Sequence, residues 1–173
     1  EGLNNIAKLE QADLNLNKSK FDLSLELEKI ITSFKPQYEN IGSKINSNLI
    51  PDVEVLMDKD KLKQVMYNLL SNSLKYSKIN AEVFLTLKSE NDSIVIELKD
   101  NGIGISEKDL PFIFERFYRS DESRDKNTGG LGIGLTIVKA IVEAHKGSIN
   151  VTSTLGKGST FFIRFPKPIL KSR

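Results

Sequence analysis

The 173-residue chain contains no cysteine and only one histidine. Without cysteine it can form neither a disulfide framework nor a thiolate metal site, and a single histidine excludes a metal centre built from several imidazoles. Lys+Arg exceed Asp+Glu by only 25 − 23 = 2 charges. So weak a charge gives no field that favours nucleic acid or acidic lipid. We therefore expect no nucleic-acid partner.

Long apolar runs are missing as well. No stretch approaches the roughly 18 residues that would span a bilayer, and no basic-then-apolar leader follows the first residue, Glu1. We expect a cytoplasmic piece of a longer protein that makes no membrane contact itself. Apolar residues make up 39% of the chain, which is enough for one core in one domain of ordinary size.

Apolar residues at helical spacing predict helices over residues 22–38 and 59–76. Asp22 is a candidate N-cap of the first helix, and Pro36 is expected to interrupt or bend its end. A third helix is predicted from about Gly132 to Lys146, ended by Gly147. The polar residues 120–130 show no periodicity, which predicts a mobile loop.

Alternation of apolar and polar residues predicts strands between these helices. The predicted strands cover residues 44–49, 53–57, 82–87, 94–99, 149–153 and 160–165. Two hairpin-like pairs separated by helices favour an α/β (α+β) two-layer sandwich, with a mixed, mostly antiparallel sheet covered on one face by helices. A doubly wound parallel sheet fits this order less well.

Three polar residues share one side of the predicted helix over 59–76. Asn68, Asn72 and Lys75 are spaced i, i+4, i+7, so they fall within roughly 60° of arc. Asparagine is a mediocre helix former, and two of them one turn apart therefore suggest a function. Amide oxygens suit Mg²⁺, and an ammonium group suits a phosphate. The alternative is the solvated flank of an ordinary helix.

Strand parity places an acidic residue among core residues. Ile96 and Leu98 share one face of their strand, so Asp100 points to the same side if the strand continues one step further. A buried carboxylate is costly unless it is hydrogen-bonded. Gly102 and Gly104 follow, and glycines let a backbone approach a ligand closely. This pattern predicts an acceptor for an exocyclic amino group such as that of adenine; an Asp-Asn-Gly turn is the alternative.

A glycine-rich run at residues 129–134, Gly-Gly-Leu-Gly-Ile-Gly, leads directly into the third predicted helix. Glycines at a helix N-terminus expose N–H groups and the positive dipole end to a phosphate. The run matches a dinucleotide fingerprint poorly because no strand precedes it, and the residues around Gly156 do not form a P-loop. The aromatic residues between 112 and 118 suit the anchor of a lid, with Arg119 near a γ-phosphate; a small core cluster is the alternative.

In this order, the motifs resemble the catalytic and ATP-binding (CA) domain of two-component sensor histidine kinases. These kinases belong to the GHKL superfamily of ATPases and kinases, which includes gyrase, a heat-shock chaperone and mismatch-repair ATPases. The N box is similar to residues 68–76, the first glycine box to 100–104, the F box to 114–119, the second glycine box to 130–135, and a closing Gly-x-Gly-[ST] turn to 156–160. The resemblance covers roughly residues 15–166 and implies a GHKL-type ATP-binding fold.

The resemblance implies ATP and Mg²⁺ as cofactors. Asp100 would accept a hydrogen bond from the adenine amino group, and Asn72 would hold Mg²⁺. The candidate catalytic residues, which would contact phosphate oxygens, are Asn68, Lys75 and Arg119. The other nucleotide-binding residues that the resemblance implies are Tyr76, Gly102, Gly104, Ile105, Phe117, Gly130, Leu131, Gly132, Ile133, Gly134, Leu135 and Thr160.

Position 68 separates two reactions of the family. Hydrolases and related serine kinases carry a glutamate at the matching position, whereas the amide of Asn68 cannot take a proton. Asn68 therefore favours transfer to a protein imidazole, which brings its own lone pair, with catalysis by positioning and charge neutralisation. The alternatives are a GHKL ATPase or serine kinase, and a non-catalytic nucleotide-sensing module.

The resemblance also implies how the chain is divided and what it binds. Residues 1–17 would be the tail of a dimerisation and phosphoacceptor hairpin with its linker, 18–167 the ATP-binding catalytic domain, and 168–173 a C-terminal tail. His145 matches a helix-end motif of the family and is expected to be structural, so the acceptor histidine would lie upstream. The expected partners are ATP, the protein's own hairpin and a cognate response regulator. We expect a monomeric fragment of a homodimeric, membrane-anchored sensor.

Overall fold

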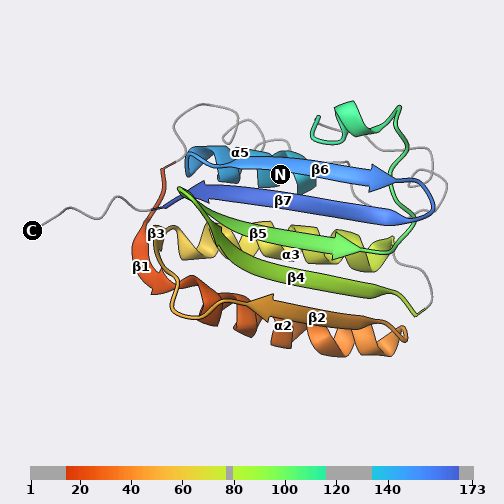
Figure 1. The fold of residues 1–173 in the computed structure, drawn as a ribbon, viewed down its shortest axis with the longest axis horizontal. Coiled ribbons are helices and arrows are strands. Elements are labelled where there is room, and N and C mark those ends of the chain that lie inside the picture. Colours follow the sequence, from red (N-terminus) through yellow and green to blue (C-terminus); the bar gives the residue numbers. More distant parts are fainter. Residues whose placement is uncertain (1–14, 77–79, 116–133, 168–173) are drawn as a thin grey trace, which may run out of the picture.

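The computed structural model describes residues 15–76, 80–115 and 134–167 of the chain. Three helices cover one face of a five-stranded sheet (Figure 1), namely α2 (Leu23–Asn40), α3 (Lys59–Lys75) and α5 (Gly134–Ala144). The strands lie in the order β2 (Lys44–Leu49), β4 (Glu82–Glu90), β5 (Ser93–Asp100), β7 (Gly158–Pro166) and β6 (Ser148–Thr154). β2 pairs with β4 in parallel, and the other three pairings are antiparallel. The predicted two-layer sandwich is therefore confirmed.

A second, smaller sheet pairs β1 (Ser19–Asp22) with β3 (Glu54–Met57) in antiparallel register. The sequence analysis did not predict β1, because its four residues, Ser-Lys-Phe-Asp, are too few to establish alternation. Asp22 ends this strand and caps α2, since its carboxylate accepts from the N–H groups of Ser24 and Leu25. The predicted N-cap is thus confirmed. A short 3₁₀ turn covers Leu110–Phe112.

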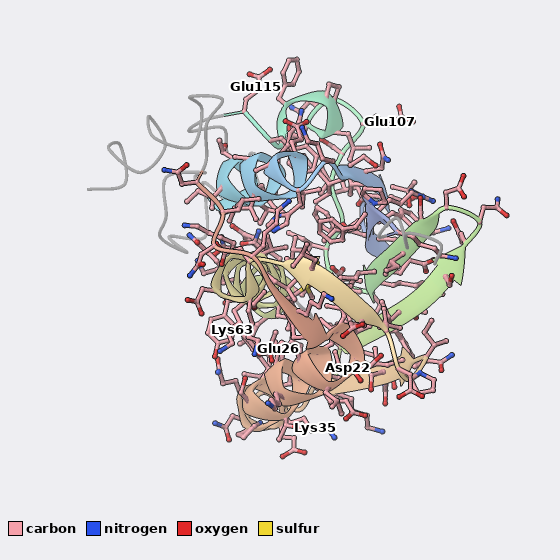
Figure 2. The ribbon with its side chains drawn as sticks, turned by 90° about the vertical axis from the view of Figure 1, so that its left-hand side faces the viewer. Asp22, Glu26, Lys35, Lys63, Glu107 and Glu115 are labelled. Carbon is pink, nitrogen blue, oxygen red and sulfur yellow. The ribbon has the colours of Figure 1, made fainter. Side chains whose placement is uncertain are left out.

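The core lies between the helices and the sheet. Along the three central strands every second residue faces the helices and is buried, as strand alternation requires. These residues are Val83, Leu85 and Leu87 on β4, Ile94, Ile96 and Leu98 on β5, and Phe161, Ile163 and Phe165 on β7. The opposing stripe on α3 consists of Leu62, Val65, Met66, Leu69 and Leu70. At the edge of the helical layer, Lys63 of α3 lies 3.8 Å from the carboxylate of Glu26 of α2 (Figure 2).

Pro36 is expected to interrupt or bend the end of helix α2, and the interruption is not found. The helix continues through Pro36 to Asn40, although proline removes one backbone hydrogen bond. Phe34 and Tyr38, on either side of Pro36, are both buried in the core. The burial of these two large aromatic side chains offsets the lost hydrogen bond and keeps the last turn helical.

The end of α5 also differs in detail from the prediction. The residue with the left-handed backbone is Lys146, at φ 66°, and not Gly147. The N–H groups of Lys146 and Gly147 donate to the carbonyl oxygens of Glu143 and Val142, which is a Schellman motif. Gly147 is required for a different reason, because a Cβ there would collide with the carbonyl oxygen of Arg164 on β7. Among the described residues, no helix combines the length and apolarity needed to cross a membrane.

Candidate nucleotide-binding site

Asp100 is the last residue of β5 and lies at the C-terminal end of α3. It pairs with Val83 on β4 and with Ser159 on β7, and its parity places it on the helix-covered face, as predicted. One carboxylate oxygen, Oδ1, accepts the N–H groups of Gly102 at 2.9 Å and Ser159 at 3.3 Å. The other oxygen, Oδ2, lies 3.4 Å from the hydroxyl of Ser73 on α3. The protein therefore holds Oδ1 firmly and Oδ2 loosely.

Burial raises the pKa of Asp100, while the hydrogen bonds from Gly102, Ser159 and Ser73 oppose that rise. A carboxylate that has lost part of its hydration gains from a further donor. Oδ2, which accepts only the long Ser73 contact among the described residues, is the atom that can take one. The arrangement suits the exocyclic amino group of a purine.

The two glycines after Asp100 allow close packing of the chain against itself. A Cβ at Gly102 would lie 2.7 Å from the carbonyl oxygen of Tyr76. Gly104 has φ 76°, and a Cβ there would collide with the carbonyl of Thr154. The sequence analysis assigned these glycines to close approach of a ligand, but the structure gives them a packing role, and ligand contact stays a prediction. Ile105, the next predicted site residue, donates its N–H to the hydroxyl of Ser153 at 2.7 Å and packs against the core.

The N-box residues Asn68, Asn72 and Lys75 lie on the last turns of α3, toward the end at which Asp100 is found. Asn68 donates from Nδ2 to the carbonyl of Gly134 at 3.4 Å, which joins α3 to the first residue of α5. Asn72 is half-buried, and none of the hydrogen bonds found for the described residues involves its side-chain amide. Lys75 is exposed at the last position of α3. The spacing of these residues thus leaves polar groups available on one side of the helix.

Tyr76 connects the N box to the first glycine box. As the C-cap of α3 it donates its N–H to the carbonyl of Asn72 at 3.1 Å and accepts the N–H of Ile103 at 3.2 Å. The segment after Asp100 is therefore held against the C-terminal end of α3. Two sequence motifs that are about thirty positions apart in the chain therefore lie side by side.

Thr160 does not share the face of the sheet on which Asp100 lies. It pairs with Lys99 and Thr152, whereas its buried neighbours Ser159 and Phe161 face the helices. Strand alternation therefore places the Thr160 side chain on the uncovered face. The register favours Ser159, whose N–H already contacts Asp100, over the predicted Thr160.

Several predicted site residues lie outside the described residues. They are Phe117, Arg119, Gly130, Leu131, Gly132 and Ile133, and the whole of the expected loop at 120–130 lies outside as well. The expected hairpin tail also lies almost entirely outside them. Of the second glycine box the structure describes Gly134, which contacts Asn68, and Leu135, which packs against the core.

Ser73, Ser159 and Tyr38 are functional candidates that the sequence analysis missed. They surround Asp100, with Ser73 on α3, Ser159 on β7 and Tyr38 on α2. Burial raises the pKa of Tyr38, and the charge of Asp100 adds to that rise. Helical spacing alone assigns Tyr38 to the core, and a serine or its backbone N–H carries no recognisable signal. Only the strand register reveals Ser159.

His145 is buried at the opposite end of α3, with 7% of its surface exposed. Its Nε2 accepts the N–H of Asp58 at 3.0 Å, and its Nδ1 donates to the carbonyl of Ile141 at 3.0 Å. Burial lowers its pKa. Both ring nitrogens are thus engaged by the backbone, in agreement with the structural role expected from the sequence.

Comparisons with known proteins bear on the family and the fold of the chain. A family model described as "Histidine kinase-, DNA gyrase B-, and HSP90-like ATPase" matches residues 57–169. The chain is 35% identical over 164 residues to the sensor protein SrrB of Staphylococcus aureus strain MRSA252, which covers 95% of this chain and 28% of SrrB. The chain therefore spans less than a third of the length of this relative.

Solved structures show the same architecture. Full-length ShkA in complex with AMPPNP aligns with a TM-score of 0.84 at 25% identity, over 95% of this chain and 34% of ShkA. The catalytic domain of histidine kinase ThkA aligns with a TM-score of 0.77 at 22% identity, over 88% of this chain and 97% of that domain. The Acinetobacter baumannii histidine kinase AdeS gives 0.76 at 24% identity, over 96% of this chain and 75% of AdeS. The last two likenesses establish the fold alone.

Proposed function

This chain belongs to the histidine kinase-, DNA gyrase B-, and HSP90-like ATPase family, and from that premise we propose that it presents Mg·ATP to a protein histidine as the ATP-binding catalytic domain of a sensor histidine kinase. ATP binding and the catalytic-domain fold are properties of this family and of its histidine kinase members. The metal, the acceptor and the partners are our proposal.

The observation that carries the proposal is the carboxylate of Asp100. It is anchored through Oδ1 by two backbone N–H groups, while Oδ2 accepts only a 3.4 Å contact from Ser73 within the described part of the chain. A half-buried carboxylate oxygen with an unfilled lone pair fits the amino group of adenine. A guanine would present a carbonyl oxygen at the same position and would be repelled. The site therefore selects adenine nucleotides.

The donor set also fits Mg²⁺. Among residues 15–76, 80–115 and 134–167, no group of three or more His, Cys, Asp or Glu side chains is placed to hold a metal by itself. Mg²⁺ bound to a nucleotide takes most of its ligands from phosphates and water, so one protein oxygen is sufficient. The amide oxygen of Asn72 is half-buried and is not used in any hydrogen bond of the described residues. When bound, the metal would neutralise charge on the phosphates.

Asn68 decides between phosphoryl transfer and hydrolysis. Its Nδ2 is directed to the carbonyl of Gly134 at 3.4 Å, and an amide cannot remove a proton from water. A neutral imidazole needs no such base, because the lone pair on one ring nitrogen attacks the γ-phosphorus directly and the bond to the β–γ bridging oxygen breaks. Lys75 and Arg119 would contact phosphate oxygens during this step.

The acceptor histidine would lie on a dimerisation hairpin that precedes residue 18 in the whole protein. Residues 168–173 would form a C-terminal tail of the catalytic domain. His145 is unsuitable as an acceptor because it is buried and both its ring nitrogens are engaged. The phosphoryl group would pass on to an aspartate of a response regulator. The whole protein would be a homodimeric, membrane-anchored sensor with this domain in the cytoplasm, and the fragment alone would be a monomer.

A phosphorylation assay tests the proposal. The full-length protein with its hairpin is incubated with γ-labelled ATP and Mg²⁺, and we expect an acid-labile, base-stable phosphoryl group that is absent in the Asn72→Ala variant. Fragment 1–173 should bind ATP but retain no label. Label retained on His145 would contradict the proposal, and steady release of phosphate from the fragment would favour an ATPase instead.

A further inference from the structure

A small cluster of hydroxyl groups lies directly behind the Asp100 carboxylate. Ser73 follows Asn72 on α3 and is buried, with 5% of its surface exposed, and its Oγ donates to Oδ2 of Asp100 at 3.4 Å. Tyr38 on α2 is fully buried, and its hydroxyl donates to the carbonyl of Leu70 at 2.8 Å. The Ser73 hydroxyl lies beside that of Tyr38. The cluster thus joins α2, α3 and the end of β5.

The number of available protons fixes the direction of these hydrogen bonds. Tyr38 has one hydroxyl proton and gives it to the carbonyl of Leu70. Ser73 also has one proton, and the charged carboxylate is a stronger acceptor than the phenolic oxygen of Tyr38. The Ser73 proton therefore goes to Oδ2, and no hydroxyl proton is left for a hydrogen bond between Ser73 and Tyr38.

Ser73 completes the orientation of the carboxylate. Two backbone N–H groups hold Oδ1, but bonds to a single oxygen still allow the carboxylate plane to tilt. The donor on Oδ2, at 3.4 Å, restricts that tilt and occupies one lone pair, which leaves the second lone pair for a ligand. A carboxylate oriented before binding loses less entropy when the purine arrives.

We infer that Ser73 is a positioning residue for adenine recognition, which acts by orienting Oδ2 of Asp100 toward the exocyclic amino group of the purine. This inference rests on the proposed function of the site and adds a specificity determinant to it. Ser73 itself does not touch the nucleotide. Its effect should therefore depend on whether the ligand carries the amino group.

Calorimetric titrations with two nucleotides separate this role from a general effect on folding. The ligands are ADP and purine riboside 5′-diphosphate, which lacks only the 6-amino group. For Ser73→Ala we expect ADP affinity to fall about three- to tenfold, the size of one net hydrogen bond. Affinity for purine riboside 5′-diphosphate should change less than about twofold, since the interaction that Ser73 supports is absent. Ser73→Thr retains a hydroxyl and should recover ADP affinity.

Ser43→Ala is the matched control. Ser43 is buried, with 2% exposed, and its hydroxyl has no hydrogen-bond partner among the described residues. Ser43 directly precedes β2, which is separated from β5 by β4, and its hydroxyl makes no bond to Asp100. The affinities for both nucleotides should therefore remain unchanged. Thermal unfolding of each variant confirms that the titrated protein is folded.

Two results would overturn the inference. Equal losses for both nucleotides in Ser73→Ala would indicate a general distortion of the site, and an unchanged ADP affinity would show that Ser73 does not orient Asp100. Failure of the proposed function gives a different result, because the unaltered chain would then bind neither nucleotide or would not distinguish ADP from its analogue.

Discussion

The two ends of helix α3 each carry an ionisable group that is buried or half-buried, but the hydrogen-bonding capacity of the two groups is used differently. At the N-terminal end, the Asp58 carboxylate accepts the N–H groups of Asn17 at 2.9 Å and Lys61 at 3.1 Å, and its own N–H is bound by His145. At the C-terminal end, Asp100 retains an incompletely used oxygen, and the amide of Asn72 has no hydrogen bond among the described residues. One end is closed by the protein, and the other is open to a ligand.

The pKa values alone do not reveal this difference. Burial lowers the pKa of His145 and raises the pKa of Asp100, so in both cases the same cause favours the neutral form. Structural and functional groups can therefore show similar shifts. The distinguishing feature is the unused hydrogen-bonding capacity, from which we propose the C-terminal end of α3 as the binding site and the N-terminal end as scaffold.

Replacement of His145 should have the largest effect on folding. His145→Ala leaves the buried N–H of Asp58 without a partner and opens a cavity, so we expect a loss of about 2–4 kcal/mol in the free energy of unfolding. Urea denaturation measures this loss. ADP affinity of the folded variant should remain unchanged, and a tenfold fall in that affinity would place His145 in the site after all.

Replacement of Asp100 should lower nucleotide affinity and leave the stability of the fold unchanged. In Asp100→Asn the amide oxygen can still accept the N–H groups of Gly102 and Ser159, which directs the NH₂ group toward the purine amino group. This clash of two donors should cost about 1–3 kcal/mol of nucleotide affinity, measured by calorimetry with ADP.

The free energy of unfolding of Asp100→Asn should not fall, because a half-buried charge is removed and both backbone hydrogen bonds are kept. Asp92→Asn, at the exposed turn between β4 and β5, is the control and should change neither quantity. Unchanged ADP affinity in Asp100→Asn would remove Asp100 from the site.

The stability of the protein should depend on pH through the scaffold end. His145 is the only histidine, and burial lowers its pKa below the ordinary value of 6.5. The unfolded chain therefore takes up a proton first, so the contribution of His145 is present above about pH 6.5 and is lost as the pH falls through its folded-state pKa. The slope approaches a limit of about 1.4 kcal/mol per pH unit for one proton.

Urea denaturation between pH 5.5 and 7.5 measures this dependence. His145→Gln does not titrate in that range and should abolish most of the slope. A slope of the same size in the variant would assign the pH dependence to other groups.

The smallest predicted effect concerns the end of α5, on the scaffold side. Lys146 adopts φ 66°, a conformation that costs a residue with a Cβ about 1 kcal/mol. Lys146→Gly should therefore raise the free energy of unfolding by about 0.5–1 kcal/mol. Lys139→Gly, at an exposed position inside α5, should lower it by about 1 kcal/mol. Equal effects of both substitutions would mean that backbone conformation does not explain them.

The sequence predicts those features that depend on periodicity. Helical and alternating patterns locate α2, α3, β4 and β5, and strand parity alone places Asp100 on the helix-covered face. Features that depend on tertiary contacts cannot be predicted from these patterns. Helix α2 continues through Pro36 because Phe34 and Tyr38 are buried in the core. Strand β1 forms because it pairs with β3, which lies more than thirty residues further along the chain.

The surroundings of Asp100 escape prediction for the same reason. The donors Ser73 and Ser159 reach Asp100 from positions 27 and 59 residues away in the chain, and the sequence indicates neither contact. The register of β7 also places Thr160 on the other face of the sheet. Motif recognition identifies the carboxylate, whereas the groups that orient it become apparent only in the folded chain.

A crystal structure of the chain with AMPPNP and Mg²⁺ tests the central claim most directly. Our account predicts the purine amino group within hydrogen-bonding distance of Oδ2 of Asp100, and the metal on the amide oxygen of Asn72. A purine bound elsewhere, with Asp100 contacting only the protein, would contradict it.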